Sequence, residues 1–438
     1  MKIKDLKNKK ICFLGLGLEN LSLIQYLVKQ GIKATVLDKR APKELGDRYK
    51  KIKTINFNFY GGPNYLKHIK NFDIIFKTPG FIGNLKTKRG VMVTTPMDLF
   101  FDLCPAKIIS ITGTKGKGTV ASLCYHVLKH NNNNVWLAGN IGKAPFDFID
   151  KLKSHHYVIL ELSSFQLVDF KKRPNIAVVT NLFPEHLSPA DPTNPIFHKS
   201  LKEYYNAKAN IFLNQKENDW LVVNKNSHHK KSLLKKSKAK LLYFKASNKL
   251  PNNPYLLGNH NMENIAAACT VAKILRISQE IVKQAIKDFK GLEHHLEFVR
   301  EITGVKFYND SASTMPQATL AAIRAFQNPV VLILGGVNKG YNLEEFVKEL
   351  KACRNLKSII LIGKTAPELE KFFNKLNPVF KVVRGAKNIS GITRKAKVLS
   401  RRGDTILFSP GFASFDMFKN SKDRGGKFKE AILTLQAA

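Results

Sequence analysis

Short apolar runs alternate along the chain with longer segments in which apolar residues recur every three or four positions. Near the start, residues 11–16 and 34–38 are mostly apolar, and residues 19–30 between them have the spacing of a helix. Apolar runs of this length predict strands buried on both faces of a sheet. The chain is therefore predicted to begin with a β-α-β unit, followed by short strands at residues 74–77 and 91–94.

The same alternation continues to the end of the chain and predicts an α/β fold with largely parallel sheets covered by helices. Because 438 residues exceed the ~250–300 that one hydrophobic core accommodates, several domains are expected. We predict three, at residues 1–104, 105–295 and 296–438. The other predicted strands cover residues 108–112, 157–162, 176–180, 305–309, 330–334, 358–362 and 405–408, and further helices cover residues 119–129 and 261–275.

Composition favours a folded protein of a reducing compartment. Hydrophobic residues make up 44% and charged residues 24% of the chain, which is ordinary for a soluble protein. The five cysteines are odd in number and far apart, which disfavours a disulfide framework or a zinc site. The basic and then apolar start resembles a signal peptide, but Glu19 and Asn20 interrupt it. A cytoplasmic protein without a membrane segment is expected.

The net charge is unusually high. Lys and Arg number 72 and Asp and Glu number 33, which gives +39. Nucleic-acid-binding proteins have such a balance, because Lys and Arg neutralise phosphates. The excess is spread over the whole chain, however, and its densest run, residues 225–240 with His228 and His229, is interpreted as a solvated surface. We expect no specific nucleic-acid partner, and a nucleic-acid-binding protein with a regulatory ATPase remains the weaker alternative.

The strongest chemical signal is Gly-Thr-Lys-Gly-Lys-Gly-Thr at residues 113–119, between a predicted strand and a predicted helix. Glycines let backbone N–H groups turn toward a phosphate, and a helix N-terminus adds positive potential. Lys117 is placed to reach the β- and γ-phosphates of ATP. Gly118 stands where a Mg²⁺-binding hydroxyl is usual, and Thr119 is the nearest substitute. The residues predicted to bind ATP here are Gly113, Thr114, Lys115, Gly116, Lys117, Gly118 and Thr119.

Two further polar residues follow neighbouring predicted strands. Glu161 ends one strand and His186 follows the next. Because ligands of open α/β sheets bind at the carboxyl ends of the strands, Glu161 is predicted to hold Mg²⁺ beside the phosphates and His186 to be a metal ligand. Lys208 has the sequence context of an ordinary surface lysine, and its neighbours alone assign it no role.

The N-terminal unit carries a partial nucleotide fingerprint. Gly15 and Gly17 follow the first strand and Asp38 ends the second, but Asn20 occupies the place of a third glycine. A dehydrogenase is conceivable on this feature alone. With the phosphate-binding loop downstream, a substrate that carries a nucleoside diphosphate is the simpler interpretation, with Gly15, Gly17 and Asp38 as its contacts.

Several blocks in the same order extend the pattern over nearly the whole chain, and with them the sequence resembles the Mur ligase family. The matching blocks are the loop at residues 113–119 and residues 139–142, 160–167, 258–264, 308–311, 334–340 and 409–418. The resemblance implies an N-terminal Rossmann-like domain, a central P-loop ATPase-like domain and a C-terminal Rossmann-like domain. It also implies a monomeric, cytoplasmic amide ligase of peptidoglycan synthesis that acts through an acyl phosphate.

The resemblance further implies substrates and residue roles. The substrates would be ATP, UDP-N-acetylmuramoyl-L-alanine and D-glutamate, with Mg²⁺ as cofactor. Lys208 matches a lysine that the family carbamylates, and Lys117, Glu161, His186 and Lys208 would be catalytic. The other implied contacts are Asn140 to the muramoyl substrate; Asn261, Asn264 and Asp310 to the nucleoside of ATP; Thr314, Lys339 and Ser414 to D-glutamate; and Thr119, Glu161, His186 and Lys208 to metal.

The chain departs from the family pattern at a few positions. His295 replaces an arginine, Ala312 and Ser313 replace Lys-Ala, and Ser421 replaces an aromatic residue. Fewer cationic contacts to ATP or D-glutamate are implied. Gly118 makes the loop similar to that of folylpolyglutamate synthases, the alternative ligase class, but those enzymes lack the roughly hundred-residue domain before the loop.

Overall fold

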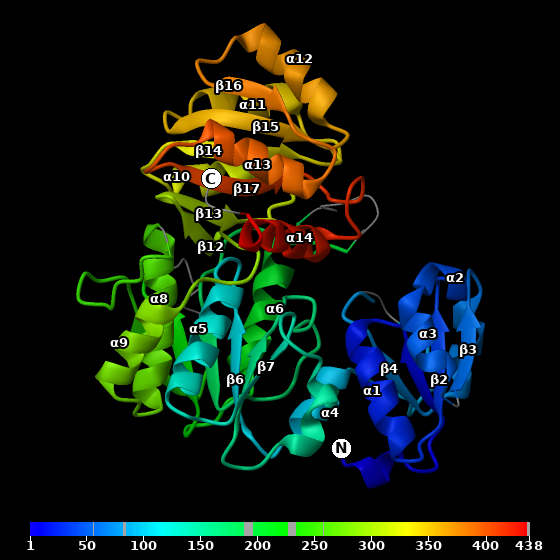
Figure 1. The fold of residues 1–438 in the computed structure, drawn as a ribbon. Coiled ribbons are helices and arrows are strands. Elements are labelled where there is room, and N and C mark those ends of the chain that lie inside the picture. The colour runs from blue at the N-terminus through cyan, green and yellow to red at the C-terminus, as the bar shows by residue number, and fades with distance from the viewer. Residues whose placement is uncertain (56, 82–84, 188–195, 227–233, 257, 436–438) are drawn as a thin grey trace. The chain divides into compact units, whose positions relative to one another are not determined.

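The computed structural model describes residues 1–438 except 56, 82–84, 188–195, 227–233, 257 and 436–438, so His228 and His229 lie outside the described residues. Within the described residues, the strands form three sheets, each flanked by helices (Figure 1). This arrangement confirms the predicted α/β fold class. In the part of the chain that the structure describes, no helix is long and apolar enough to span a membrane.

The N-terminal sheet is parallel and has the strand order β3-β2-β1-β4-β5. Strands β1 and β2 are buried along their whole length, which explains why they are apolar at consecutive positions. The strands are β1 (Ile11–Leu14), β2 (Ala34–Asp38), β3 (Phe57–Gly61), β4 (Ile74–Lys77) and β5 (Met92–Thr94). The helices are η1 (Ile3–Leu6), α1 (Leu18–Lys29), α2 (Pro42–Leu45), α3 (Asp47–Lys53), η2 (Tyr65–Asn71) and α4 (Pro96–Leu103).

The central sheet is also parallel, with the order β11-β10-β9-β6-β8-β7. Strand β6, which leads into the glycine-rich loop, lies between β9 and β8. The strands are β6 (Lys107–Thr112), β7 (Val135–Gly139), β8 (Tyr157–Glu161), β9 (Ile176–Val179), β10 (Trp220–Asn224) and β11 (Lys240–Phe244). The helices are α5 (Lys117–His130), η3 (Pro145–Asp147), η4 (Ile149–Lys151), α6 (Leu201–Leu213), α8 (Asn259–Ile274) and α9 (Gln279–Asp288).

The third sheet has the order β12-β13-β17-β14-β15-β16, and β12 runs antiparallel to β13 while the other neighbours are parallel. The strands are β12 (Glu297–Ile302), β13 (Val305–Asn309), β14 (Val330–Gly335), β15 (Leu356–Ile362), β16 (Lys381–Arg384) and β17 (Thr405–Gly411). The helices are α10 (Pro316–Arg324), α11 (Leu343–Lys351), α12 (Ala366–Leu376), α13 (Ile389–Leu399) and α14 (Ser421–Leu433).

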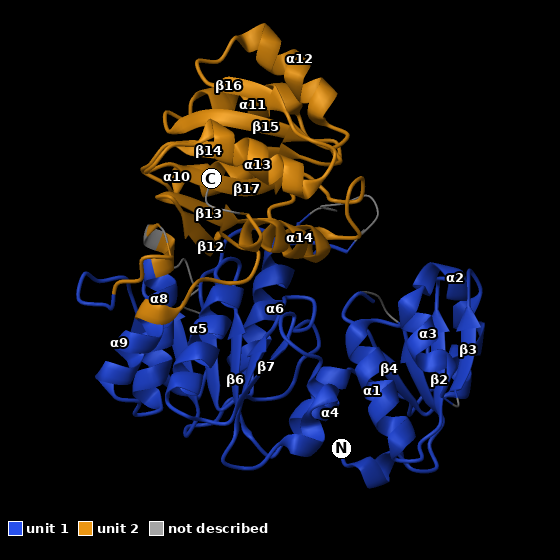
Figure 2. Ribbon diagram, in the orientation of Figure 1, with its two compact units in different colours: residues 1–251, 262–286 blue, residues 252–261, 287–438 orange. Residues whose placement is uncertain are grey.

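The chain divides into two compact units, residues 1–251 with 262–286 and residues 252–261 with 287–438 (Figure 2). The first unit contains the N-terminal and central sheets, and one hydrophobic cluster that includes Phe100 and Phe146 takes buried residues from both. The second unit contains the third sheet. The three domain boundaries predicted from the sequence stay a prediction.

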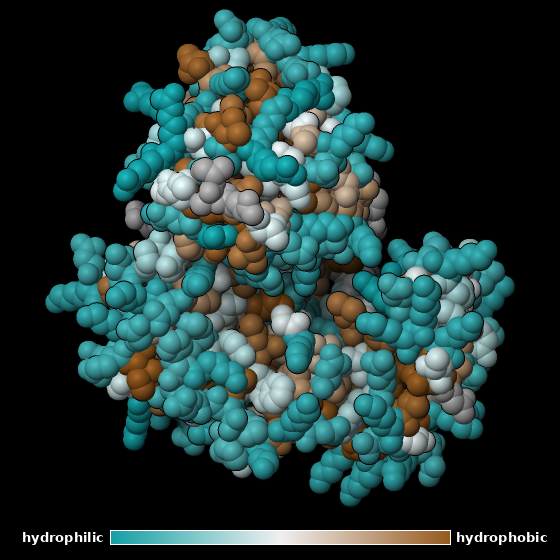
Figure 3. Space-filling model, viewed as in Figure 1, coloured by the Kyte–Doolittle hydropathy of each residue, from teal (hydrophilic) through white to brown (hydrophobic). Residues whose placement is uncertain are grey.

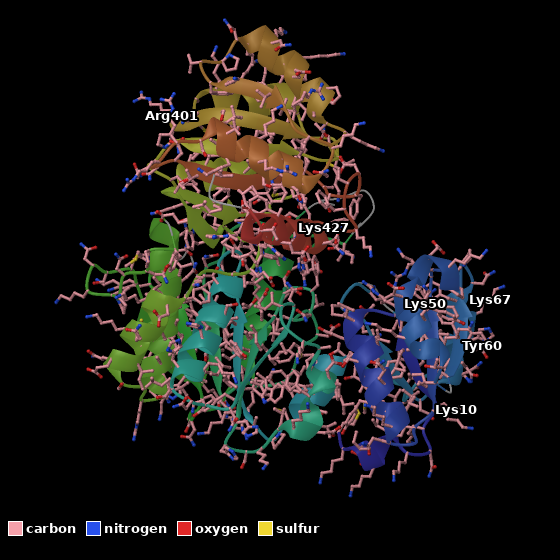
Figure 4. The ribbon with its side chains drawn as sticks, viewed as in Figure 1. Lys10, Lys50, Tyr60, Lys67, Arg401 and Lys427 are labelled. Carbon is pink, nitrogen blue, oxygen red and sulfur yellow. The ribbon has the colours of Figure 1, made fainter. Side chains whose placement is uncertain are left out.

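The face of the molecule shown in Figure 3 is covered mainly by hydrophilic residues. Lys10, Lys50 and Lys67 near the N-terminus and Arg401 and Lys427 near the C-terminus are exposed (Figure 4). Lys129 and Lys202, in the middle of the chain, are exposed as well. The positive charge is therefore distributed over the surface rather than concentrated on one element.

Candidate functional site

The glycine-rich loop joins β6 to α5 and can be formed only by glycine at two positions. A Cβ atom on Gly113 would lie 1.8 Å from Thr180 Oγ1, and one on Gly116 would lie 2.3 Å from Asn264 Oδ1. Both glycines also have positive φ angles, +151° and +77°. Helix α5 begins at Lys117, and the first N–H groups of a helix have no partner inside it. The geometry is that of an anion-binding helix N-terminus.

Hydrogen bonds hold the first part of the loop, Thr114 and Lys115, against neighbouring segments of the protein. The Thr114 hydroxyl lies 2.9 Å from the Tyr204 hydroxyl and accepts a hydrogen bond of 3.0 Å from the Phe183 N–H. The N–H groups of Thr114 and Lys115 donate to the backbone oxygen and side-chain oxygen of Asn181, at 2.9 and 2.8 Å. These hydrogen bonds fix the first part of the loop and engage the N–H groups of Thr114 and Lys115 within the protein.

Lys208 is buried, and the expectation of an ordinary surface lysine is wrong. Tyr204, Lys208 and Ile211 share the buried face of α6 because they are spaced four and three residues apart. The Lys208 Nζ donates to the Gly113 carbonyl at 2.8 Å, and the Lys117 Nζ donates to the Thr114 carbonyl at 3.3 Å. Burial, followed by the charge of Lys117, lowers the pKa of Lys208 to about 7.

Glu161 ends β8 beside the loop and is buried. Its Oε1 accepts a hydrogen bond of 3.2 Å from Asn140 Nδ2. Burial raises the pKa of this carboxyl, and Lys117, the Asn140 hydrogen bond and Lys208 offset part of the effect. The structure thus brings together the predicted residues Lys117, Asn140, Glu161 and Lys208 at one edge of the central sheet.

His186 follows β9 in a backbone conformation that is rare for a non-glycine residue, with φ +57°. Such a conformation costs roughly 1–3 kcal/mol and is common at functional sites. Its ring lies edge-on to Phe165, with centroids 5.3 Å apart. Burial lowers the pKa of His186, against the opposing effect of Glu185, so the imidazole is kept neutral and able to coordinate a cation.

The donor set fits a magnesium ion shared with a nucleotide. Among the described residues, no group of three or more His, Cys, Asp and Glu side chains could hold a metal by itself. Mg²⁺ is usually bound by one or two carboxylates together with substrate phosphates and water, so a fully formed protein cage is not required. The buried carboxylate of Glu161, whose pKa is raised, is the group that a cation would stabilise here.

In the N-terminal sheet, Gly15 and Gly17 form a tight turn before α1. A Cβ atom on Gly15 would lie 2.5 Å from the Thr78 side chain. Asn20 replaces the third glycine and donates to the Gly15 carbonyl at 2.7 Å, so it holds the turn from within. A glycine there could not make this bond.

Asp38 is already engaged inside the protein. Its carboxylate accepts hydrogen bonds from the Leu16 N–H at 2.7 Å and from the Arg40 guanidinium at 2.8 and 2.9 Å. Burial alone would raise the pKa of Asp38, but the hydrogen bonds from Arg40 and Leu16 outweigh it and lower the pKa. Arg40 was missed from the sequence, where it was one basic residue among many.

In the second unit, three predicted contacts follow the neighbouring strands β13, β17 and β14. Thr314 follows β13, Ser414 follows β17, and the exposed Lys339 follows β14. The backbones of Val337 and Ala413 pair through two hydrogen bonds of 2.8 and 3.2 Å, which bring the Lys339 and Ser414 loops side by side. These residues therefore converge at one sheet edge.

The predicted nucleoside contacts are divided between the two units. Asn264 lies against Gly116 in the first unit, whereas the buried Asn261 belongs to the second. Asp310 in the second unit accepts hydrogen bonds from Ser313 and Ser409, at 2.6 and 2.7 Å. Burial raises the pKa of Asp310 to about 6. Its part in nucleoside binding stays a prediction.

Comparison with known proteins supplies independent information. Residues 111–254 match the Mur ligase middle domain. The chain is 37% identical to the UDP-N-acetylmuramoylalanine–D-glutamate ligase of Clostridium tetani, over 99% of this chain and 98% of that protein. It is 36% identical to the ligase of the same name from Ruminiclostridium cellulolyticum, over 99% of this chain and 98% of that protein.

Two solved structures share the fold. The UDP-N-acetylmuramate-alanine ligase of Thermotoga maritima superposes with a TM-score of 0.57 at 16% identity, covering 98% of this chain and 100% of that one. A MurF ligase from the same organism, in complex with ADP, gives 0.55 at 17% identity, covering 92% of this chain and 95% of that one. At these identities the likeness concerns the fold.

Proposed function

The chain belongs to the Mur ligase family, with UDP-N-acetylmuramoylalanine–D-glutamate ligases as relatives over its full length, and from this premise we propose how its residues act. It is an ATP-dependent ligase of peptidoglycan precursor synthesis that joins D-glutamate to UDP-N-acetylmuramoyl-L-alanine. The observation that carries the mechanism is the convergence of the glycine-rich loop, Glu161 and two lysines at one edge of the central sheet.

A carboxylate is a poor electrophile, so its activation requires phosphoryl transfer from ATP. The N-terminus of α5 and Lys117 would hold the phosphates and stabilise the charge that develops on them. A magnesium ion held by Thr119, Glu161 and His186 would offset the negative charge of the same oxygens. The acyl phosphate that forms is then attacked by the amine of D-glutamate, and inorganic phosphate leaves.

Lys208 is proposed to react with carbon dioxide. The neutral Nζ amine attacks the carbon of CO₂, a C–N bond forms, and one proton is released, which leaves an anionic carbamate. A pKa of about 7 makes the amine available near neutrality, whereas an ordinary lysine would be protonated. The carbamate would add a second anionic group beside Glu161 for the cation.

This chemistry predicts a pH-dependent response to bicarbonate. Protein stripped of CO₂ should regain activity when bicarbonate is added at a pH above that of the lysine's titration, because the amine is then neutral. Below that pH the ammonium form dominates and recovery should be slow. Mass spectrometry of the protein trapped with a methylating agent would locate the adduct. Equal recovery on both sides of the pKa would contradict this proposal.

The acceptor is proposed to bind at the N-terminal turn and at the edge of the central sheet. The N-terminus of α1 after Gly17 suits a diphosphate, and Arg40 adds a cation beside it. A cavity of about 300 Å³ borders Phe165 and Gln166 in the same unit. A folate has no diphosphate for this turn, so the N-terminal sheet disfavours the folylpolyglutamate synthase alternative.

The amine substrate is tested with a panel of D- and L-amino acids. Purified protein with ATP, Mg²⁺ and UDP-N-acetylmuramoyl-L-alanine should release phosphate with D-glutamate, because Lys339 offers a cation and Thr314 and Ser414 offer hydroxyl groups to a dicarboxylic amino acid. The product mass should equal the acceptor plus glutamate minus water. Preference for an uncharged amino acid, or for L-glutamate on a folate, would contradict the proposed specificity.

A further inference from the structure

His198 is a fully buried residue beside the proposed metal site, and the mechanism above gives it no part. Its Nε2 lies 2.9 Å from the Ser164 hydroxyl, which is itself buried. Its ring stacks on Phe165 with centroids 4.8 Å apart and planes 2° apart, and it packs edge-on against Tyr204 at 5.3 Å. The ring is thus held by two aromatic neighbours and at one nitrogen.

The same residue holds the turn that carries His186. The His198 N–H donates to the His186 carbonyl at 2.8 Å. His186 has a left-handed backbone conformation, which persists only where the surroundings restrain it. The hydrogen bond from the His198 N–H restrains His186 in this way. It can form only if the backbone of His198 stays in its present position.

On its other side, His198 reaches the segment that follows β8. Ser164 lies three residues after Glu161 in a segment that is buried at Leu162 and Ser164. The other ring nitrogen, Nδ1, has no hydrogen-bond partner among the described residues. An unpartnered buried nitrogen is tolerated better as an acceptor than as a donor, so we assign the proton to Nε2, which donates to Ser164.

We propose that His198 is a positioning residue that fixes the distance between Glu161 and His186 by bonding to Ser164 on one side and to the His186 carbonyl on the other. The inference rests on the proposed function, because it assumes that Glu161 and His186 hold the divalent cation. Partners that orient metal ligands typically contribute 10- to 100-fold to metal affinity or activity. The bond between the His198 side chain and Ser164 fixes the position of the His198 backbone, and the His198 N–H in turn holds the His186 carbonyl.

The test compares the unmodified protein with three variants at positions 198 and 164, with the double variant His198→Phe/Ser164→Ala, and with a control variant. His198→Phe keeps the volume and the stack on Phe165 but loses the bond to Ser164, and Ser164→Ala removes the partner hydroxyl from the other side. His198→Gln keeps an N–H that can reach Ser164. Ser110→Ala is the matched control, because Ser110 is a buried serine of neighbouring β6 whose hydroxyl has no hydrogen-bond partner among the described residues.

The affinity for Mn²⁺ is measured by calorimetric titration in the presence of ADP. For each variant, the affinity for ADP without metal and the midpoint of thermal unfolding are also measured. We expect His198→Phe and Ser164→Ala each to raise the Mn²⁺ dissociation constant about ten-fold while ADP affinity stays unchanged. The double variant should be no weaker than either single variant, because both changes remove the same bond. His198→Gln and Ser110→Ala should bind Mn²⁺ like the unmodified protein.

Unchanged Mn²⁺ affinity in Ser164→Ala would overturn the proposal, even if His198→Phe failed to fold. Additive effects in the double variant would also overturn it, since they would mean that the two side chains act independently. Failure of the proposed function would be recognised by a different result. The unmodified protein would then release no phosphate when acceptor and amino acid are added.

Discussion

Lys117→Ala is expected to abolish most ATP-dependent phosphate release while the fold remains intact. Lys117 is the first residue of α5, and its Nζ donates a hydrogen bond to the Thr114 carbonyl. Its side chain is therefore not part of an apolar core. In phosphoryl transfer the protein acts mainly through charge placed at the phosphate oxygens. Removal of one such donor costs roughly a hundred- to a thousand-fold in rate. The measurement is the rate of phosphate release with all three substrates at saturation.

Lys129→Ala is the matched control for this variant. Lys129 lies in the last turn of the same helix, at the end opposite the glycine-rich loop, and its Nζ is 5.8 Å from the centroid of the Tyr125 ring. Its removal should change the rate by less than two-fold, in line with surface substitutions generally. Near-normal turnover of Lys117→Ala would contradict the assignment of the ATP site.

Lys208→Ala should be inactive and partly restored by small carboxylates such as formate or acetate. The substitution removes both a buried side chain and the proposed carbamate, and leaves space beside Tyr204 and Gly113. A free carboxylate that enters this space would supply the missing negative charge for the cation. The loss is expected to be roughly a thousand-fold, comparable with the loss of other groups that stabilise the transferring phosphoryl.

Lys202→Ala provides the control on the same helix, because Lys202 is exposed. It should retain normal activity and show no response to carboxylates. The informative measurement is the rate as a function of carboxylate concentration, which should saturate for Lys208→Ala only. Full activity of Lys208→Ala without any additive would contradict a role for the carbamate.

The sequence predicted most of the inner strands and missed most of the edge strands, with exceptions in both groups: the buried β10 was missed and the exposed edge strand β5 was predicted. Strands β1 and β9 are buried at every position, and their apolar runs identified them. Strands β3, β11 and β16 lie at the edges of the three sheets and are partly exposed, and each is short or contains polar residues. A strand with one face in solvent has apolar residues only at alternate positions, so over four or five residues it leaves no continuous apolar run to identify it.

The candidate site could be predicted where chemistry follows local backbone geometry. The loop at residues 113–119 and Glu161 stand at the carboxyl ends of strands that the sequence identifies, and this position alone suggests a ligand site. Lys208 and His198 could not be found in this way. Lys208 depends on how α6 packs against the loop, at a sequence distance of 95 residues from Gly113. His198 depends on how the segment before α6 packs against Ser164, at a sequence distance of 34 residues.

Asn20 and Asp38 show a further reason why local motifs are incomplete. Asn20 looked like a missing glycine, but its side chain bonds to the turn that a glycine would leave open. Asp38 was predicted to contact the nucleotide-linked substrate, but Arg40 and Leu16 donate hydrogen bonds to both of its oxygens. A pattern of residue types does not reveal which polar groups are already paired inside the fold.

The central claim is that this chain forms an amide through an acyl phosphate, and one isotope measurement tests it directly. UDP-N-acetylmuramoyl-L-alanine is labelled with ¹⁸O at both oxygens of its carboxylate and incubated with the protein, ATP, Mg²⁺ and D-glutamate. An oxygen of that carboxylate becomes the bridge to phosphorus, and it leaves with phosphate when the amine attacks the carbonyl carbon. We expect each molecule of product to be accompanied by one inorganic phosphate that carries a single ¹⁸O. Unlabelled phosphate, or label found in AMP, would contradict the claim.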